Sequence, residues 1–229
     1  MTGQSRRGNP ERVPIPSRDG LCRAEPGDVH ASSLVAEALR VNARYVEEVV
    51  IAWDLCPWAA QSWRRGAVAR RVLPAVPPDP AELLPLVDAL AAQPAIEIGL
   101  VIFAGAAIEP AAFDRFAERL RRADQARRPP GAAAPPFLMA AFHPARAVEP
   151  GTPAALVPFI RRTPDPTLQL VRGALLEGLS RGGRDLSSEI GQANFATVQG
   201  RSPAALDAVI RDIQRDRDTS YAALGARGK

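Results

Sequence analysis

The chain is poor in the residues that form disulfides and bind metals: its 229 residues include only two cysteines and two histidines. A secreted domain stabilised by disulfides normally carries more cysteines at regular spacings, so the sequence predicts a protein of the reducing cytoplasm. One cysteine and one histidine fall near the N-terminus, and a zinc site would need carboxylates to complete it. The sequence therefore gives no support for a metal, and it identifies no cofactor.

Long apolar runs are also missing. No segment approaches the roughly 20 apolar residues that cross a bilayer, and the charged N-terminus has no apolar run behind it. We therefore expect no membrane partner and no signal peptide. The sequence also contains no internal repeat, no Gly-x-Gly-x-x-Gly, no P-loop and no zinc-type cysteine spacing.

Lysine and aromatic residues are scarce in a chain that is otherwise basic. The net charge is +4, the only lysine is Lys229, and aromatic residues make up 5% of the chain. A nucleic-acid surface needs clustered cations beside aromatic platforms, whereas the arginines here are interleaved with acids. We therefore expect no nucleic-acid partner, and we attribute the many arginines to genomic composition.

What the sequence does contain is enough apolar material for one domain, since 46% of its residues are hydrophobic. Residues 1–30 are rich in Pro, Gly, Arg and Ser and cannot bury enough surface to become ordered. They are predicted to form a disordered tail that holds Cys22 and His30. Residues 31–226 are predicted to form a single domain, and the sequence leaves its oligomeric state open.

Three short apolar segments predict strands, at residues 68–76, 96–104 and 137–142. The second, IEIGLVIFA, is apolar on both faces, which is typical of an interior strand in a parallel sheet. Helical patterns separate the three segments. The order strand, helix, strand, helix, strand predicts an α/β fold with a small three-stranded, mainly parallel sheet. An N-terminal helix and two to three C-terminal helices would cover it.

Apolar residues at steps of three and four predict the helices. The first spans residues 33–55, and another spans 79–92, opened by Asp79 and Glu82 as a capping box with a kink or late start at Pro85. A third begins at Pro110.

Further helices are predicted toward the C-terminus. Asp165 and Pro166 are the N-cap and first residue of a predicted helix that ends at Gly182, with a buried stripe of Leu168, Val171, Leu175 and Leu179. Residues 190–198 predict a helix or an irregular cover. A last helix opens at Ser202 and Pro203, and its alternating acids and bases are expected to face solvent.

Cys56 lies in the segment DLCPWA at residues 54–59 and has two interpretations. If Pro57 is the first residue of a short helix, Cys56 is its N-cap, and the helix dipole shifts the thiol toward the thiolate that a nucleophile or metal ligand needs. Alternatively, Cys56 is a buried structural residue between Leu55 and Trp58.

His143 directly follows the third predicted strand, at the edge of the sheet where α/β proteins bind ligands. It is a candidate catalytic residue, or else a capping and packing residue. Arg162 and Arg172 are candidates for binding a substrate carboxylate or phosphate, because guanidinium groups match both anions. In so arginine-rich a chain they can equally be part of a solvated surface.

Three motifs together resemble a bacterial family of unknown function, DUF1415: DLCPWA at residues 54–59, AFHP at 141–144, and RRTPDP at 161–166 with Leu168 and Arg172 behind it. The likeness extends over about residues 35–224, including Ile190, Asn194 and the segment 216–221. The family's cysteine-proline, histidine-proline and arginine-x-proline elements fall on Cys56, His143 and Arg162. The resemblance therefore favours functional roles for Cys56 and His143.

The chain also departs from the family pattern. Gln169 and Gly173 stand where the resemblance leads us to expect a histidine and a glutamate, and Asp165 stands in place of an aromatic residue. If the missing histidine or glutamate belongs to the site, this member has changed or lost activity.

Two functions from different classes remain open. In the first, the protein is a small soluble enzyme acting on an anionic metabolite, with Cys56 and His143 catalytic and Arg162 and Arg172 binding the substrate. In the second, it is a non-catalytic ligand-binding or accessory protein in which Cys56 and His143 are structural. The enzyme hypothesis requires the Cys56 sulfur and the His143 ring to approach each other.

Overall fold

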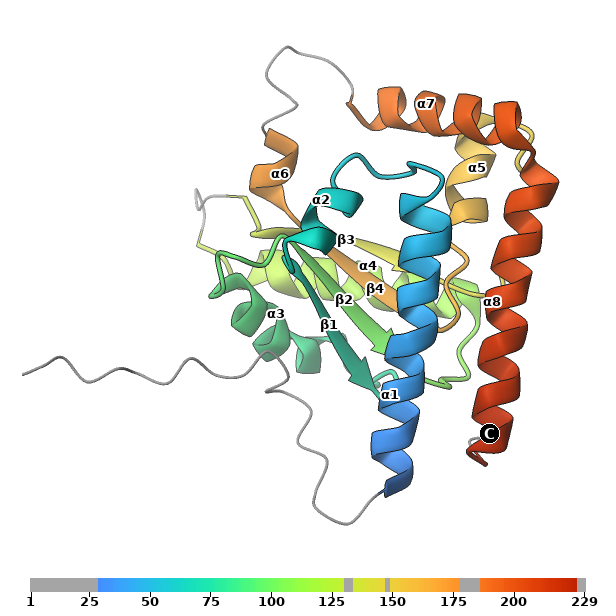
Figure 1. Cartoon of the computed structure of the whole chain (residues 1–229). Helices are drawn as coiled ribbons and strands as arrows, with labels where there is room; N and C mark the ends of the chain where they lie inside the picture. The colour runs from blue at the N-terminus through green and yellow to red at the C-terminus, as the bar shows by residue number, and fades with distance from the viewer. Residues whose placement is uncertain (1–28, 130–133, 147–148, 178–185, 226–229) are drawn as a thin grey trace, which may run out of the picture.

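The computed structural model describes residues 29–129, 134–146, 149–177 and 186–225 (Figure 1). Its single sheet has the strand order β1 (Val68–Leu73), β2 (Ile98–Phe103), β4 (Thr167–Arg172), β3 (Phe137–Phe142). β1 and β2 pair in parallel, and β4 is antiparallel to both β2 and β3. Three strands therefore run in one direction and β4 runs in the other.

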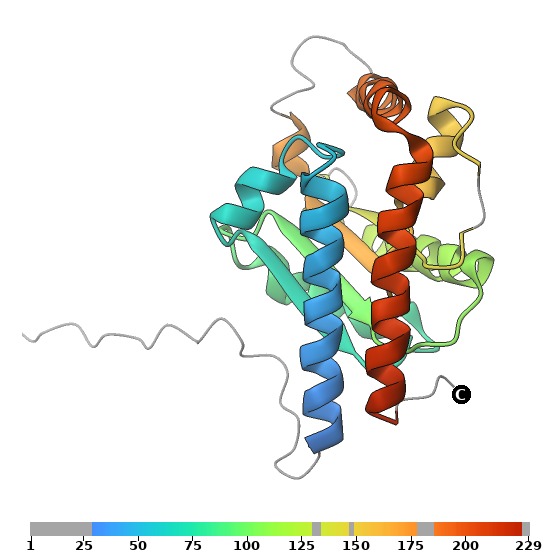
Figure 2. The same cartoon turned by 45° about the vertical axis from the view of Figure 1, so that its right-hand side comes forward.

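Helices cover both faces of the sheet (Figures 1 and 2). One face is covered by α1 (Val29–Arg44) with its π-helical extension η1 (Tyr45–Ile51), by α2 (Ala59–Arg64) and by α8 (Pro203–Ala223). The other is covered by η2 (Pro80–Leu83), α3 (Leu84–Ala91) and α4 (Pro110–Ala126). The remaining helices are α5 (Pro153–Ile160), α6 (Gly173–Glu177) and α7 (Leu186–Arg201). Within these residues, no helix is both long enough and apolar enough to cross a membrane.

The mixed α/β character and the three predicted strand positions are confirmed. The predicted opening of the second helix is also found, because the Asp79 carboxylate accepts a hydrogen bond from the Ala81 N–H at 2.9 Å. This cap opens the 3-10 turn η2, and Pro85 stands in the first turn of α3, where its missing N–H costs nothing. The predicted conflict at Pro85 is resolved as a late start of the α-helix.

The prediction of a three-stranded, mainly parallel sheet is wrong. The predicted helix from Pro166 is instead strand β4, which lies between β2 and β3, and only the short α6 after it is helical. Alternation explains the difference: Leu168 and Leu170 are fully buried on the α4 side, while Gln169 points to the opposite face. The segment 178–185, with the predicted end of that helix, lies outside the described residues.

Asp165 therefore does not cap a helix. Its carboxylate is 1% exposed and accepts hydrogen bonds from the Gly105 N–H at 3.0 Å, the Tyr221 hydroxyl at 2.7 Å and the Arg217 guanidinium at 2.9 Å. These contacts connect the loop that follows β2 to α8. Arg217 accordingly turns inward, which corrects the prediction of a fully solvated surface on the last helix.

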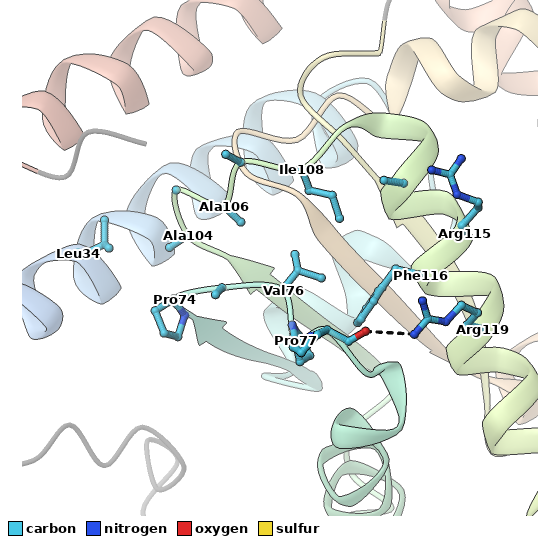
Figure 3. Close-up of a pocket in the computed structure, with 15 residues that line it drawn as sticks. Leu34, Pro74, Val76, Pro77, Ala104, Ala106, Ile108, Arg115, Phe116 and Arg119 are labelled. Atoms are coloured by element: carbon cyan, nitrogen blue, oxygen red, sulfur yellow. Dashed lines mark hydrogen bonds between the residues drawn. The ribbon is translucent and has the colours of Figure 1, made fainter. Parts of the chain in front are cut away.

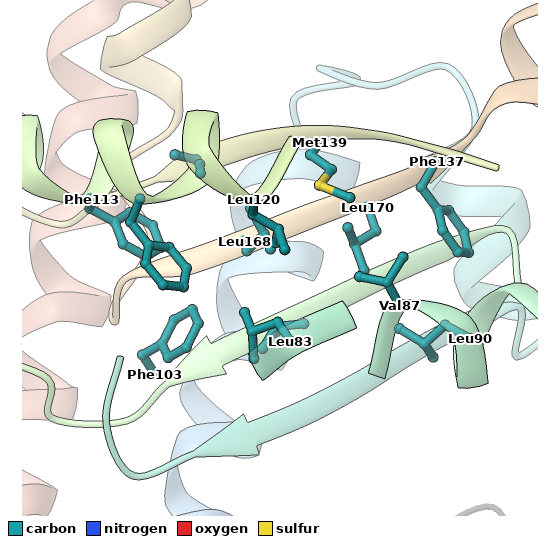
Figure 4. Close-up of a cluster of buried hydrophobic side chains, with 14 of the residues drawn as sticks. Leu83, Val87, Leu90, Phe103, Phe113, Leu120, Phe137, Met139, Leu168 and Leu170 are labelled. Carbon is teal, nitrogen blue, oxygen red and sulfur yellow. The ribbon is translucent and has the colours of Figure 1, made fainter. Parts of the chain in front are cut away.

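The main core lies between the sheet and the layer formed by α3 and α4 (Figure 4). Phe103 of β2 meets Phe113 and Phe116 of α4 edge-on, with ring centroids 5.6 and 6.0 Å apart. Phe113 and Phe116 are themselves stacked. These rings fix the start of α4 against the carboxyl end of β2.

The first helix ends before the predicted residue 55. It changes from α-helical to π-helical at Tyr45 and stops at Ile51. Asp54 then adopts a left-handed conformation with φ of 51°, which turns the chain toward Cys56. The π-helical segment packs on the sheet face that carries Ile98 and Leu100.

Candidate functional site

Cys56 lies in the turn between η1 and α2. Helix α2 begins at Ala59 with Trp58 at its cap, so Cys56 does not occupy the N-cap position. Burial raises the pKa of the Cys56 thiol, and hydrogen bonds from the Trp58 and Ala59 backbone N–H groups offset only part of that rise. The thiol is thus biased toward its protonated form, the opposite of the shift expected from a helix dipole.

His143 follows β3 directly, as predicted, and is 3% exposed. Its Nδ1 accepts a hydrogen bond from the Ala145 N–H at 3.1 Å, which leaves the proton on Nε2. Nε2 then donates to the Ile108 carbonyl oxygen at 2.8 Å. The ring also packs against Phe113, with centroids 6.0 Å apart. Both ring nitrogens are engaged within the fold.

Burial is the main cause that lowers the pKa of His143. Because the unfolded state then binds the proton more readily, His143 contributes stability above its ordinary pKa of about 6.5 and loses it as the pH falls below that value. We expect His143→Gln to cost about 1–3 kcal/mol near neutrality. The gap between wild type and variant, measured by urea unfolding, should narrow from about pH 7.5 to about pH 5. A gap that is constant or widens would contradict this account.

The described residues contain no hydrogen bond or ring contact between Cys56 and His143. The preceding residue explains why: the Phe142 ring lines a cavity together with Cys56, whereas the His143 ring packs against Phe113 of α4. Consecutive residues at the end of a strand point to opposite faces of a sheet. The two side chains therefore belong to different layers.

Arg162 and Arg172 are both engaged with the protein. Arg162 donates to the Asp207 carboxylate at 2.7 Å and stacks on Phe159, so it ties the end of α5 to α8. Arg172 donates to the carbonyl oxygens of Ile96 and Gln93 at 2.7 and 2.9 Å. These bonds hold the segment that enters β2. Both guanidinium groups thus hold parts of the fold together.

A crevice of about 740 Å³, here called the edge crevice, opens at the carboxyl ends of β1 and β2 (Figure 3). One wall is the proline-rich segment 74–78 after β1, and the other is the loop 104–108 after β2. Phe116 of α4 forms its inner side, and Leu34 of α1 closes one end. Such a position, beyond the carboxyl ends of parallel strands, is where open α/β sheets bind ligands.

The charges at the edge crevice are of one sign. Arg115 and Arg119 of α4 line it, and the lining residues include no acid. Arg119 donates to the Pro78 carbonyl oxygen at 3.1 Å, while Arg115 is exposed and makes no ion pair within the described part of the chain. The sequence alone does not single out either arginine, because arginines on the outer side of a helix usually face solvent.

His143 and Asp165 do not line the edge crevice, but both form hydrogen bonds to residues in its wall. The Nε2 of His143 bonds to Ile108 in one wall, and Asp165 bonds to Gly105 in the same wall. Gly105 has a φ of +69°, a conformation that favours glycine, and space is open beside it. His143 and Asp165 thereby fix the loop that follows β2.

A smaller cavity of about 50 Å³, here called the Cys56 cavity, lies on the opposite side of the sheet between η1 and the strands. It is mostly apolar, and its lining also includes the polar residues Asn42, Tyr45, Cys56, Thr163, Thr167 and Gln169. Across the residues that the structure describes, no group of three or more His, Cys, Asp and Glu side chains could hold a metal ion. Neither cavity is a metal centre built from such a group.

Comparison with known proteins addresses the family. A family model described as a protein of unknown function (DUF1415) matches residues 37–208. The chain belongs to the DUF1415 family. The matched region contains all four strands, Cys56, His143 and most of the residues that line the two cavities. No curated protein and no solved structure matches the chain. Membership in DUF1415 thus confirms the resemblance seen in the motifs and assigns no reaction.

Proposed function

We propose that this DUF1415 protein binds an anionic small molecule with an apolar body in the edge crevice. The observation that supports this most is the composition of the crevice: about 740 Å³ of space lined by two arginines, no acidic residue and many apolar side chains. Val76, Ile108 and Phe116 would cover the apolar body of the ligand. Arg115 and Arg119 would bind its carboxylate, sulfonate or phosphate at the rim.

The proposed role is binding without catalysis. A nucleophile and its base must lie within hydrogen-bond reach, and Cys56 and His143 make no such contact. We propose that His143 positions the Ile108 wall of the crevice, and that Arg162 and Arg172 hold helices and strands in place. In this account the ligand is an anion, as the sequence led us to expect, but different arginines bind it.

Replacing Arg115 by Gln tests this proposal. We expect the protein to bind 1-anilinonaphthalene-8-sulfonate, an amphipathic anion, with a fluorescence increase that octanoate reverses and octylammonium does not. Arg115→Gln should weaken the affinity for the dye by roughly 3- to 10-fold, because the guanidinium is exposed and its interaction with an anion is screened. The measurement is a fluorescence titration at fixed ionic strength.

Arg122→Gln is the matched control. Arg122 lies on the same helix, is 78% exposed at its side chain, pairs with Glu118 and does not line the crevice. Arg122→Gln changes the net charge by the same amount as Arg115→Gln and should leave the affinity for the dye unchanged. Equal effects of the two substitutions, or equal displacement by octanoate and octylammonium, would reject an anion site in the edge crevice.

A further inference from the structure

The Cys56 cavity is distinct from the edge crevice, since no residue lines both. Its roof is η1, which contributes Tyr45, Val46 and Val50, and its floor includes Ile98 and Leu100 of β2. π-helical turns inside a helix are rare and frequently occur at functional sites. The π-helical segment η1 therefore favours a functional role for the cavity that it covers.

Asn42 is the most unusual of these groups. It is 2% exposed, it lines the cavity, and its Oδ1 is buried with no hydrogen-bond partner in the described part of the chain. A buried amide without a partner costs stability, and such groups are therefore rare unless a ligand or water completes them. A ligand or water in the cavity that Asn42 lines could supply the missing donor.

Gln169 of β4 is a second amide residue that lines the same cavity; it is half-buried, and its side chain makes no hydrogen bond to the described residues. The hydroxyl groups nearby differ, because Thr163 and Thr167 both donate to the Asp165 carbonyl oxygen, at 2.7 and 2.9 Å. Two amides are thus available in the cavity while its hydroxyl groups are already engaged.

We propose that the Cys56 cavity binds a small neutral molecule that carries a primary carboxamide, held by hydrogen bonds to the Asn42 and Gln169 amides beside the Cys56 thiol. A side-chain amide offers a donor next to an acceptor, and another amide offers the complementary edge. No lining residue from the described chain is an acid, a lysine or an arginine, so a charged ligand would be left without a counter-ion.

The size of the ligand follows from the size of the cavity. A water molecule needs about 10–15 Å³ of such space, so a cavity of about 50 Å³ accommodates about four water-sized groups. Acetamide has this size. Acetone and acetate have the same shape as acetamide. Acetone has no hydrogen-bond donor, and acetate carries a negative charge. These three molecules therefore separate amide recognition from simple filling of the cavity.

Alkylation of Cys56 provides the test, in a Cys22→Ser protein where Cys56 is the only thiol. Iodoacetamide carries the proposed carboxamide: the sulfur attacks its methylene carbon, iodide leaves, and the thiol proton passes to solvent. At about pH 8.5, the ordinary pKa of a thiol, we expect the rate to saturate with iodoacetamide concentration. Acetamide should protect Cys56, whereas acetone and acetate should not.

Asn42→Leu is the informative variant. It removes the unpartnered amide at nearly constant volume, so we expect Tm to rise by about 2–4 °C. At the same time, the preference of Cys56 for iodoacetamide over iodoacetate should fall by about tenfold, the value of one hydrogen bond. A rate that is linear in iodoacetamide, insensitive to acetamide and equal in the variant would overturn the proposal.

If Cys56 reacts only after unfolding, ¹H–¹⁵N NMR spectra of the side-chain amides test the proposal instead. Acetamide should then still shift the ¹H–¹⁵N resonances of Asn42 and Gln169 in the folded protein. Absent shifts, or equal shifts with acetone, mean that the cavity holds ordered water only, and they overturn the proposal. The outcome is independent of the edge crevice, which Asn42 does not line.

Discussion

Asp165→Ala is expected to lower the free energy of unfolding by about 3–5 kcal/mol, because it removes a buried carboxylate that pairs with Arg217 and accepts two further hydrogen bonds. The Arg217 guanidinium, the Tyr221 hydroxyl and the Gly105 N–H all donate to Asp165, which is 1% exposed. Without it, the Gly105 N–H and the Tyr221 hydroxyl lose this acceptor, and Arg217 keeps only its exposed pairing with Asp218 at 2.8 Å. Urea unfolding at neutral pH measures the loss.

Asp165→Asn is the matched control for that substitution. Asparagine keeps the volume and one acceptor oxygen but gives up the charge that Arg217 faces, so its cost should lie clearly below that of alanine. Because Gly105 lines the edge crevice, Asp165→Ala should also weaken binding of the sulfonate dye. An alanine variant as stable as wild type would show that the junction contributes little to the fold.

Phe113→Ala is expected to cost a similar amount, about 3–5 kcal/mol, through the cavity it leaves in the main core. Phe113 is fully buried and contacts three rings: Phe103 edge-on at 5.6 Å, Phe116 stacked at 6.1 Å and His143 at 6.0 Å between centroids. It therefore joins β2, α4 and the end of β3. Thermal and urea unfolding would both report the loss.

Phe113→Leu separates lost volume from lost aromatic contacts. Leucine fills most of the space, so the variant should lose about 1–2 kcal/mol, mainly the preference of rings for edge-on contact. If leucine and alanine destabilised the protein equally, the aromatic geometry rather than burial would dominate. If neither did, Phe113 would not belong to the core that fixes the start of α4.

The parts of the fold that sequence predicts well are those specified locally. The strands at Val68–Leu73, Ile98–Phe103 and Phe137–Phe142 are short apolar runs bounded by turn residues, and capping marks the start of η2. Each pattern lies within about ten residues. Sheet order is different, because it depends on pairing between distant segments.

β4 shows where the local argument fails. Leu168, Val171 and Leu175 fit a helical period, while Leu168 and Leu170 fit a strand period, and both patterns are present in the same segment. Pairing with β2 and β3 decides between them, since a central strand satisfies its backbone hydrogen bonds on both sides. The sequence of the segment alone does not reveal these hydrogen bonds to neighbouring strands.

The Cys56 cavity was not predicted, because residues 167–172 were assigned to a helix instead of strand β4. Only when residues 167–172 form a strand does Gln169 point toward η1 and share a cavity with Cys56. The resemblance to DUF1415 leads us to expect a histidine at the position of Gln169.

The edge crevice was predictable in place but not in composition. A ligand site at the carboxyl ends of the strands follows from the α/β pattern, and His143 does lie at that edge. Its ring is nevertheless used to hold Ile108, and the cations at the crevice come from the exposed side of α4. Arginines that bind a ligand and arginines that face solvent have the same sequence signature.

The central claim is that the edge crevice binds an amphipathic anion, and a ¹H–¹⁵N titration with octanoate tests it most directly. We predict saturable shifts at Gly105, Ala106, Ile108 and Ala112, all of which line the crevice, with no comparable shifts around Cys56. Octylammonium should leave the same resonances in place. Shifts that are absent, that do not saturate, or that occur equally with the cation would contradict the account.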